Sequence, residues 1–207
     1  MALGTVIRSF AAPTTKGRGL TFDGRTLWHV EDEDNLIHQI DPETGKDIRS
    51  FASPAVANQG LTFDGRYLWC VGYTDNLIHQ IDPETGKDIR SFASPAVAAR
   101  GLTWDGRCLW NANDIEDLIY QIDPATGKMI RSIQAPATSG RCLTFDGRTL
   151  WIADSITNIQ YQLEILTGTI IRSFASPAVS PGGLAWDGRT LWYADYNTNL
   201  IYQIDIG

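Results

Sequence analysis

The chain has 207 residues, with 17 basic and 24 acidic side chains, so its formal net charge is −7. Hydrophobic residues make up 43% and charged residues 20%, which is typical of a globular protein and excludes a disordered one. No apolar run reaches the ~18 residues of a membrane span, and the first residues lack the features of a secretory signal. We therefore expect a cytoplasmic protein with no membrane partner. Net acidity argues against a nucleic-acid partner, because binding nucleic acid depends on neutralising phosphates.

The three cysteines, Cys70, Cys108 and Cys142, are widely spaced and odd in number. Such a pattern predicts neither a disulfide framework nor a metal knuckle, and it favours free thiols in a reducing compartment.

A repeat of 41 residues runs through the chain. The phrase Gly-Leu-Thr-Phe-Asp-Gly-Arg begins at Gly19 and again at Gly60, and variants of it begin at Gly101, Cys142 and Gly183. Such self-similarity is the mark of a repeat architecture. The predicted units are 19–59, 60–100, 101–141, 142–182, and 183–207 completed by 1–18.

Each unit has the signals of four short strands, which in the second unit are expected at 60–63, 66–71, 77–81 and 87–92. An Asp-Gly pair at 64–65 and the Asp-Pro-Glu-Thr-Gly phrase at 82–86 form the turns, and a linker at 93–97 leads onward. Four strands in about 40 residues are typical of a propeller blade.

The first residues have the sequence of a fourth strand, since 7–10 match 48–51, and the fifth unit lacks that strand. An N-terminal strand that completes the last blade would close the ring and remove its open edges. An open solenoid, the main alternative, would need polar caps at both ends. We therefore predict one all-β domain over 1–207, a closed five-bladed β-propeller with four antiparallel strands per blade.

The segments 191–205 and 82–89 resemble repeats of the YVTN-type and NHL-type propellers. This resemblance covers all five units and implies the fold but no particular activity. Those propellers usually have more blades, so a natural protein, a recently amplified or trimmed array and an engineered one all stay open. The five-bladed plant-type glutaminyl cyclases have similar Gly-Leu and Thr-Gly-Lys phrases. That likeness is confined to the frame, and no catalytic residue is carried over.

Two sets of repeated residues are expected to build the frame. One tryptophan per unit is predicted to pack between blades, and these are Trp28, Trp69, Trp110, Trp151 and Trp192. One arginine per fourth strand is predicted to pair with the aspartates of the Asp-Gly turns, and these are Arg8, Arg49, Arg90, Arg131 and Arg172. His38 and His79 stand where other units have tyrosine, so they are expected to pack as tyrosine substitutes.

Units one and two differ at only seven of 41 positions, and six of the seven lie near the second-to-third loop or the connection between blades. In an antiparallel blade these two segments lie at the same end. We call this end the variable face; its loops lie around 29–33, 70–74, 111–116, 152–157 and 193–198. The opposite end, with the Asp-Gly and Pro-Glu-Thr-Gly turns, is the constant face.

The variable face has ten acidic residues against Lys16, Arg18, Arg100 and Arg141, a net charge of −6. Such a face favours a cation or a basic partner, and the alternative is that its charge serves solubility alone. The candidate ligand-binding residues are His29, Glu31, Asp32, Glu33, Cys70, Tyr73, Asn111, Asn113, Asp154, Tyr193, Asp195 and Tyr196.

These residues suggest several chemistries, each incomplete. The acids are ligands suited to Ca²⁺, but no Asp-x-Asp-x-Asp-Gly loop is present, so no cofactor is required. His29 and Cys70 share a repeat position and resemble part of a zinc or nucleophile pair without a third ligand. Tyr73 and Tyr196 suit a sugar.

The sequence predicts a monomeric, non-enzymatic binding or scaffold module whose variable face contacts an unknown small ligand, a cation or a basic partner. The alternatives are a metal-binding or sugar-binding lectin-like propeller, and a propeller hydrolase or lyase that uses the acidic variable face. Glu31, Asp32 and Glu33 are expected to have no packing role, so reversing their charge should leave folding intact.

Overall fold

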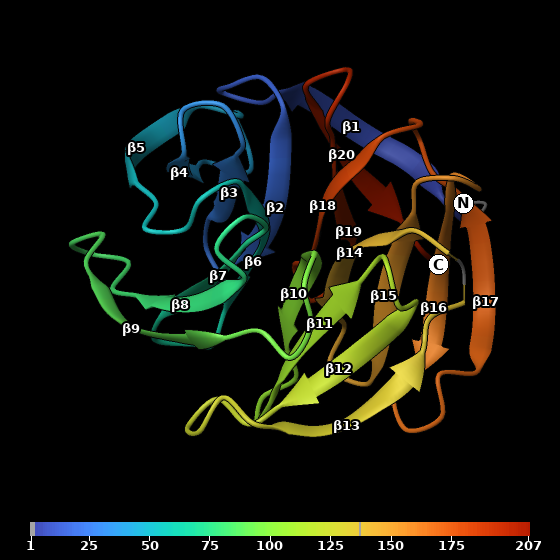
Figure 1. Ribbon diagram of the computed structural model, residues 1–207. Helices are drawn as coiled ribbons and strands as arrows, with labels where there is room; N and C mark the ends of the chain where they lie inside the picture. The colour runs from blue at the N-terminus through green and yellow to red at the C-terminus, as the bar shows by residue number, and fades with distance from the viewer. Residues whose placement is uncertain (1–2, 137) are drawn as a thin grey trace.

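The computed structural model describes residues 3–136 and 138–207, and every regular element in them is a β-strand. Five four-stranded antiparallel sheets stand around a common axis as the blades of a closed propeller (Figure 1). The predicted fold is confirmed. No helix in the described ranges is long and apolar enough to cross a membrane.

The strands follow the repeat closely. Blade 1 consists of β2 (Gly17–Phe22), β3 (Leu27–Glu31), β4 (Leu36–Ile40) and β5 (Asp47–Ala52). Blade 2 consists of β6 (Asn58–Phe63), β7 (Leu68–Gly72), β8 (Leu77–Ile81) and β9 (Asp88–Ala93). Blade 3 consists of β10 (Ala99–Trp104), β11 (Leu109–Asn113), β12 (Leu118–Ile122) and β13 (Met129–Gln134). Blade 4 consists of β14 (Gly140–Phe145), β15 (Thr149–Asp154), β16 (Ile159–Glu164) and β17 (Ile170–Ala175). Blade 5 consists of β18 (Pro181–Trp186), β19 (Leu191–Asp195), β20 (Leu200–Asp205) and β1 (Thr5–Ala11).

The two ends of the chain share blade 5, where β1 forms the outer strand beside β20 (Figure 1). Val6 is paired with Ile204 and Phe10 with Ile201, in antiparallel register. The pairing continues beyond the strand, since the Ala12 amide donates to the Asn199 carbonyl at 2.9 Å. This arrangement closes the ring and excludes the open solenoid.

The inner strands β2, β6, β10, β14 and β18 approach one another so closely that glycine is required at their centres. A Cβ on Gly60 would lie 2.4 Å from the Arg100 carbonyl oxygen and 2.7 Å from the Leu102 nitrogen. Blade 4 is the exception, with the buried Cys142 at this repeat position. A free volume of only about 10 Å³ remains on the axis, which is room for one water molecule at most.

The repeated tryptophans are buried between blades, as predicted, and their partners come from the turns. In blade 1 the Trp28 indole Nε1–H donates to the Asp23 carboxylate at 2.7 Å. Arg49 lies over the Trp28 ring, 5.4 Å from its centroid, and its Nε donates to the Gln39 side chain at 2.7 Å. The expected pairing of these arginines with the turn aspartates is therefore wrong. The aspartate accepts from the indole and its own turn, while the arginine reaches the next blade's turn at the Glu84 carbonyl.

Candidate functional site

Four of the candidate residues lie inside the blades, beneath the variable face. His29, Cys70 and Asn111 share one repeat position with Tyr193, and all four are fully buried. His29 Nδ1 lies 3.1 Å from the Gly19 carbonyl oxygen, and burial lowers the pKa of its imidazole to about 4. Burial likewise raises the pKa of the Cys70 thiol to about 12. At neutral pH the imidazole is thus neutral and the thiol protonated, so neither is activated for chemistry.

Four further candidates are acceptors for backbone N–H groups at the end of the second strand. Asp154 accepts from the amides of Ser139 at 3.0 Å, Ile156 at 3.0 Å and Thr157 at 2.6 Å. Each carboxylate or amide at this position therefore fixes the second-to-third loop, and in blades 4 and 5 it also ties that loop to the connection between blades. The residues are Glu31, Asn113, Asp154 and Asp195.

In blade 2 a different residue accepts the backbone N–H groups of this loop. Gly72 occupies the capping position, and a Cβ there would lie 2.1 Å from Asp75 Oδ1. The Asp75 carboxylate accepts from the amides of Leu77 at 3.1 Å and Val56 at 3.2 Å. Asp75 thus takes the place of the missing side chain.

The expectation that Glu31, Asp32 and Glu33 have no packing role is wrong for Glu31. Its carboxylate is 1% exposed and accepts from the amides of Glu33, Asp34 and Leu36 at 2.6–3.0 Å. Alternation along the strand end directs this side chain inward. Asp32 pairs with Arg18 at 3.2 Å, and only Glu33 is a surface charge, 3.6 Å from the Lys16 ammonium.

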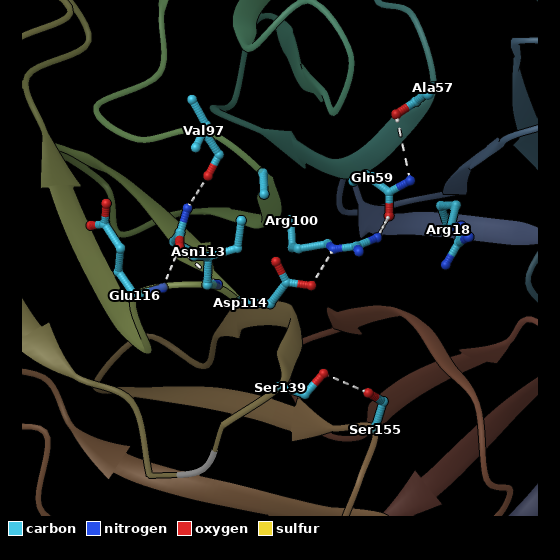
Figure 2. A network of polar contacts seen from close by, with 12 residues as sticks. Arg18, Ala57, Gln59, Val97, Arg100, Asn113, Asp114, Glu116, Ser139 and Ser155 are labelled. Carbon is cyan, nitrogen blue, oxygen red and sulfur yellow. Dashed lines mark hydrogen bonds and ion pairs between the residues drawn. The ribbon is translucent and has the colours of Figure 1, made fainter.

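The arginines of the variable face converge where the central channel opens. Arg18, Arg100 and Arg141 stand at one repeat position at the start of β2, β10 and β14, and we call them the arginine cluster. Gln59 and Gly182 occupy this position in blades 2 and 5, and both border the free volume on the axis. Figure 2 shows Arg100 extending to Gln59 of the neighbouring blade, with Arg18 beside it; the Arg100 Nη1–Gln59 Oε1 distance is 2.8 Å.

Two members of the cluster have an acidic partner on their own blade. Arg18 contacts Asp32 at 3.2 Å, and Arg100 Nε donates to Asp114 Oδ2 at 2.7 Å (Figure 2). The corresponding residue of blade 4 is Ser155, whose hydroxyl bonds to Ser139 Oγ at 2.8 Å instead (Figure 2). Among the described residues of its own blade, Arg141 is therefore left without an acidic partner.

Tyr73 and Tyr196 stand at the repeat position of Asp32 and Asp114, and each lies against the arginine of the next blade. The Arg100 guanidinium is 4.4 Å from the Tyr73 ring centroid, and that of Arg18 is 4.0 Å from the Tyr196 ring. These cation–π contacts hold the two arginines at the channel mouth.

Sequence reasoning counted these arginines as part of the variable face but missed that they gather. The signal was present, since residues 41 apart in a closed ring lie around one axis. The candidate residues therefore fall into two main groups, one at the channel mouth and one beneath it. Asp32, Tyr73 and Tyr196 border the channel mouth; the buried and capping residues support it from beneath. In the described ranges, no three His, Cys, Asp or Glu side chains converge as metal ligands.

No protein-family model matches the chain, and no curated protein sequence is significantly similar to it. Many solved structures share its fold. The glutaminyl cyclase of Myxococcus xanthus has a TM-score of 0.84 at 14% identity, over 99% of this chain and 97% of that one. A chain of the nidogen–laminin complex has a TM-score of 0.70 at 19% identity, over 94% and 77%. Virginiamycin B lyase of Staphylococcus aureus has a TM-score of 0.59 at 21% identity, over 96% and 69%. These structural similarities show the propeller fold alone, because the sequence identities are all 21% or lower.

Proposed function

We propose that this chain is a non-enzymatic binding module whose ligand contacts the centre of the variable face. One observation carries the proposal. The blades differ at the two repeat positions that surround the channel mouth, the first with Arg18, Gln59, Arg100, Arg141 and Gly182, the second with Asp32, Tyr73, Asp114, Ser155 and Tyr196. Buried positions beneath the face also vary, as His29, Cys70 and Asn111 do, but the arginines and tyrosines at the mouth are not fully buried and can reach a ligand, so variation there favours recognition.

The chemistry of the site supports binding over catalysis. The nucleophile and base candidates, Cys70 and His29, are sealed in the blades with pKa values shifted away from neutrality. The carboxylates of Glu31, Asp154 and Asp195 already accept backbone N–H groups, which favours a structural role for them over general acid–base work. Calcium binding stays a prediction, and it would have to compete with these hydrogen bonds.

The resemblance to YVTN-type and NHL-type repeats is part of this proposal. It is supported by the fold that this chain shares with solved propellers of varied function. This chain has five blades, whereas YVTN-type and NHL-type propellers usually have more. Monomeric state and cytoplasmic location stay predictions from the sequence.

The proposal is tested by titrating the isotopically labelled protein and following its backbone amide resonances. The probes are glucose, ATP, glutamate and calcium chloride. A ligand of this module should shift resonances at 31–35, 72–76 and 113–117 on the variable face. The triple variant R18Q/R100Q/R141Q should weaken that binding for ATP, glutamate or glucose and strengthen it for calcium, whereas R25Q/R107Q/R148Q, with the same charge change on the constant face, should alter neither. Shifts confined to the Asp-Gly turns, or equal binding by both variants, would refute the proposed site.

A further inference from the structure

Arg141 is the member of the arginine cluster whose charge is left unbalanced. Among the described residues, none accepts a hydrogen bond from its guanidinium, and its Nε is both inaccessible to solvent and without a partner. Ser155, which stands where blades 1 and 3 have aspartate, is engaged with Ser139. An unpaired cation in a partly buried place is unfavourable, so an acceptor from outside the chain would stabilise it.

The charged neighbours of Arg141 make an anion beside it more favourable. Burial lowers the pKa of this guanidinium, and the positive charges of Arg100 and Arg18 lower it further. The two aspartates, Asp32 and Asp114, balance two of the three arginines and leave one net positive charge at the mouth. Since like charges repel at this range, the cluster is most stable when an anion lies among them.

The floor of the mouth limits what fits there. The free volume on the axis, about 10 Å³, is too small for any group larger than water. Blade 5 contributes no side chain at this repeat position, because a Cβ on Gly182 would lie 2.1 Å from the Gly17 carbonyl oxygen. A ligand group therefore rests on the mouth and does not enter the channel.

Asp114 gives a second feature of the ligand. Its Oδ2 accepts from Arg100, but its Oδ1 is buried and has no partner in the described ranges. Asp114 also lies close enough to Arg141 to influence its charge. An unpaired acceptor beside an unpaired cation fits a group that has both negative oxygens and a hydrogen-bond donor, as hydrogen phosphate has.

We infer that the arginine cluster is an oxyanion-binding site, in which Arg141 holds the phosphate or carboxylate group of a small molecule at the channel mouth. The planar guanidinium fork of Arg141 matches such oxygens in pairs, and Arg18 and Arg100, which lie against the rings of Tyr196 and Tyr73, line the same mouth. This inference deepens the proposed binding function and depends on it.

The test is a thermal melt of the intact chain in potassium phosphate, sulfate, acetate or chloride at equal ionic strength. Phosphate at ~100 times its dissociation constant should raise Tm by several degrees over chloride. Sulfate, which has no donor for Asp114, should raise it less, and acetate reports on carboxylate ligands. If acetate stabilises and phosphate does not, the phosphate part of the inference is overturned.

Two single variants complete the test. R141Q should bind phosphate at least tenfold more weakly than the wild type. In chloride at low salt it should have a higher Tm than the wild type, because the repulsion between Arg141 and the other two arginines is removed. Gln59 fills the same repeat position in blade 2, so glutamine fits there. The control R107Q removes an exposed arginine of the constant face and should keep the full effect. Equal phosphate stabilisation of R141Q, or none in the wild type, would overturn the inference. Binding of glucose or calcium at the variable face would still uphold the proposed function in that case.

Discussion

Glu31→Ala tests whether a buried carboxylate holds the variable face in shape. In the folded chain this carboxylate is 1% exposed and accepts from three backbone amides, those of Glu33, Asp34 and Leu36. Alanine removes all three acceptor contacts and leaves the amides at the end of β3 without their partner.

The expected cost follows from these contacts. A hydrogen bond to a charged group contributes about 1.5–3 kcal/mol net to the free energy of unfolding. The sum of three such bonds is an upper limit on the loss, and the true loss is well below it. Because the loop lies at the surface, water can reach some of the freed amides. We therefore expect a loss of about 3 kcal/mol in the free energy of unfolding, or a Tm lower by about 6–12 °C for a chain of this size.

Glu33→Ala is the matched control, two residues away. Its carboxylate is half exposed and lies 3.6 Å from the Lys16 ammonium, so it should contribute less than about 1 kcal/mol. Urea titrations of both variants, followed by tryptophan fluorescence, give the two free energies. If Glu31→Ala is as stable as Glu33→Ala, the capping role of this carboxylate is refuted.

Three more predictions follow from the frame. Deleting residues 1–11 removes β1 and exposes the β20 edge, so the product should lose its cooperative melt or self-associate in size-exclusion chromatography; an unchanged monomer and Tm would contradict ring closure by β1. His29 has an ordinary pKa of 6.5 that burial lowers to about 4, so its contribution to stability is present above pH 6.5 and is lost as the pH falls toward 4. From pH 7 to pH 4 the wild type should lose about 3 kcal/mol more than His29→Asn, which copies Asn111 of blade 3; parallel losses in urea titrations would contradict the neutral imidazole. Because all three cysteines are buried and burial raises their pKa values, a thiol reagent at pH 8 should label none in the native protein and three in urea, and rapid native labelling of Cys70 would speak against its burial.

Much of the fold is local information repeated five times. The Asp-Gly turns, the alternating strands and the 41-residue period predict blades, and the complementary ends predict the closed ring. The partners of the repeated arginines could not be predicted in this way. A sequence shows that Arg49 and Asp23 recur together, but only the packed blade decides that the indole of Trp28 takes the aspartate and Gln39 takes the arginine.

The candidate site divides in the same manner. Topology alone placed the varied residues on one face, and the charge count of that face was acidic. The sequence could not predict which way each side chain points or how deeply it is buried, because neighbouring side chains at a strand end alternate between inward and outward. Glu31 points inward and caps the loop, whereas Asp32 points toward Arg18. The sequence thus determined the five blades, their closure and the face that varies. Only the tertiary structure, by bringing residues 41 positions apart around one axis, decided that the centre of an acidic face is a cluster of arginines.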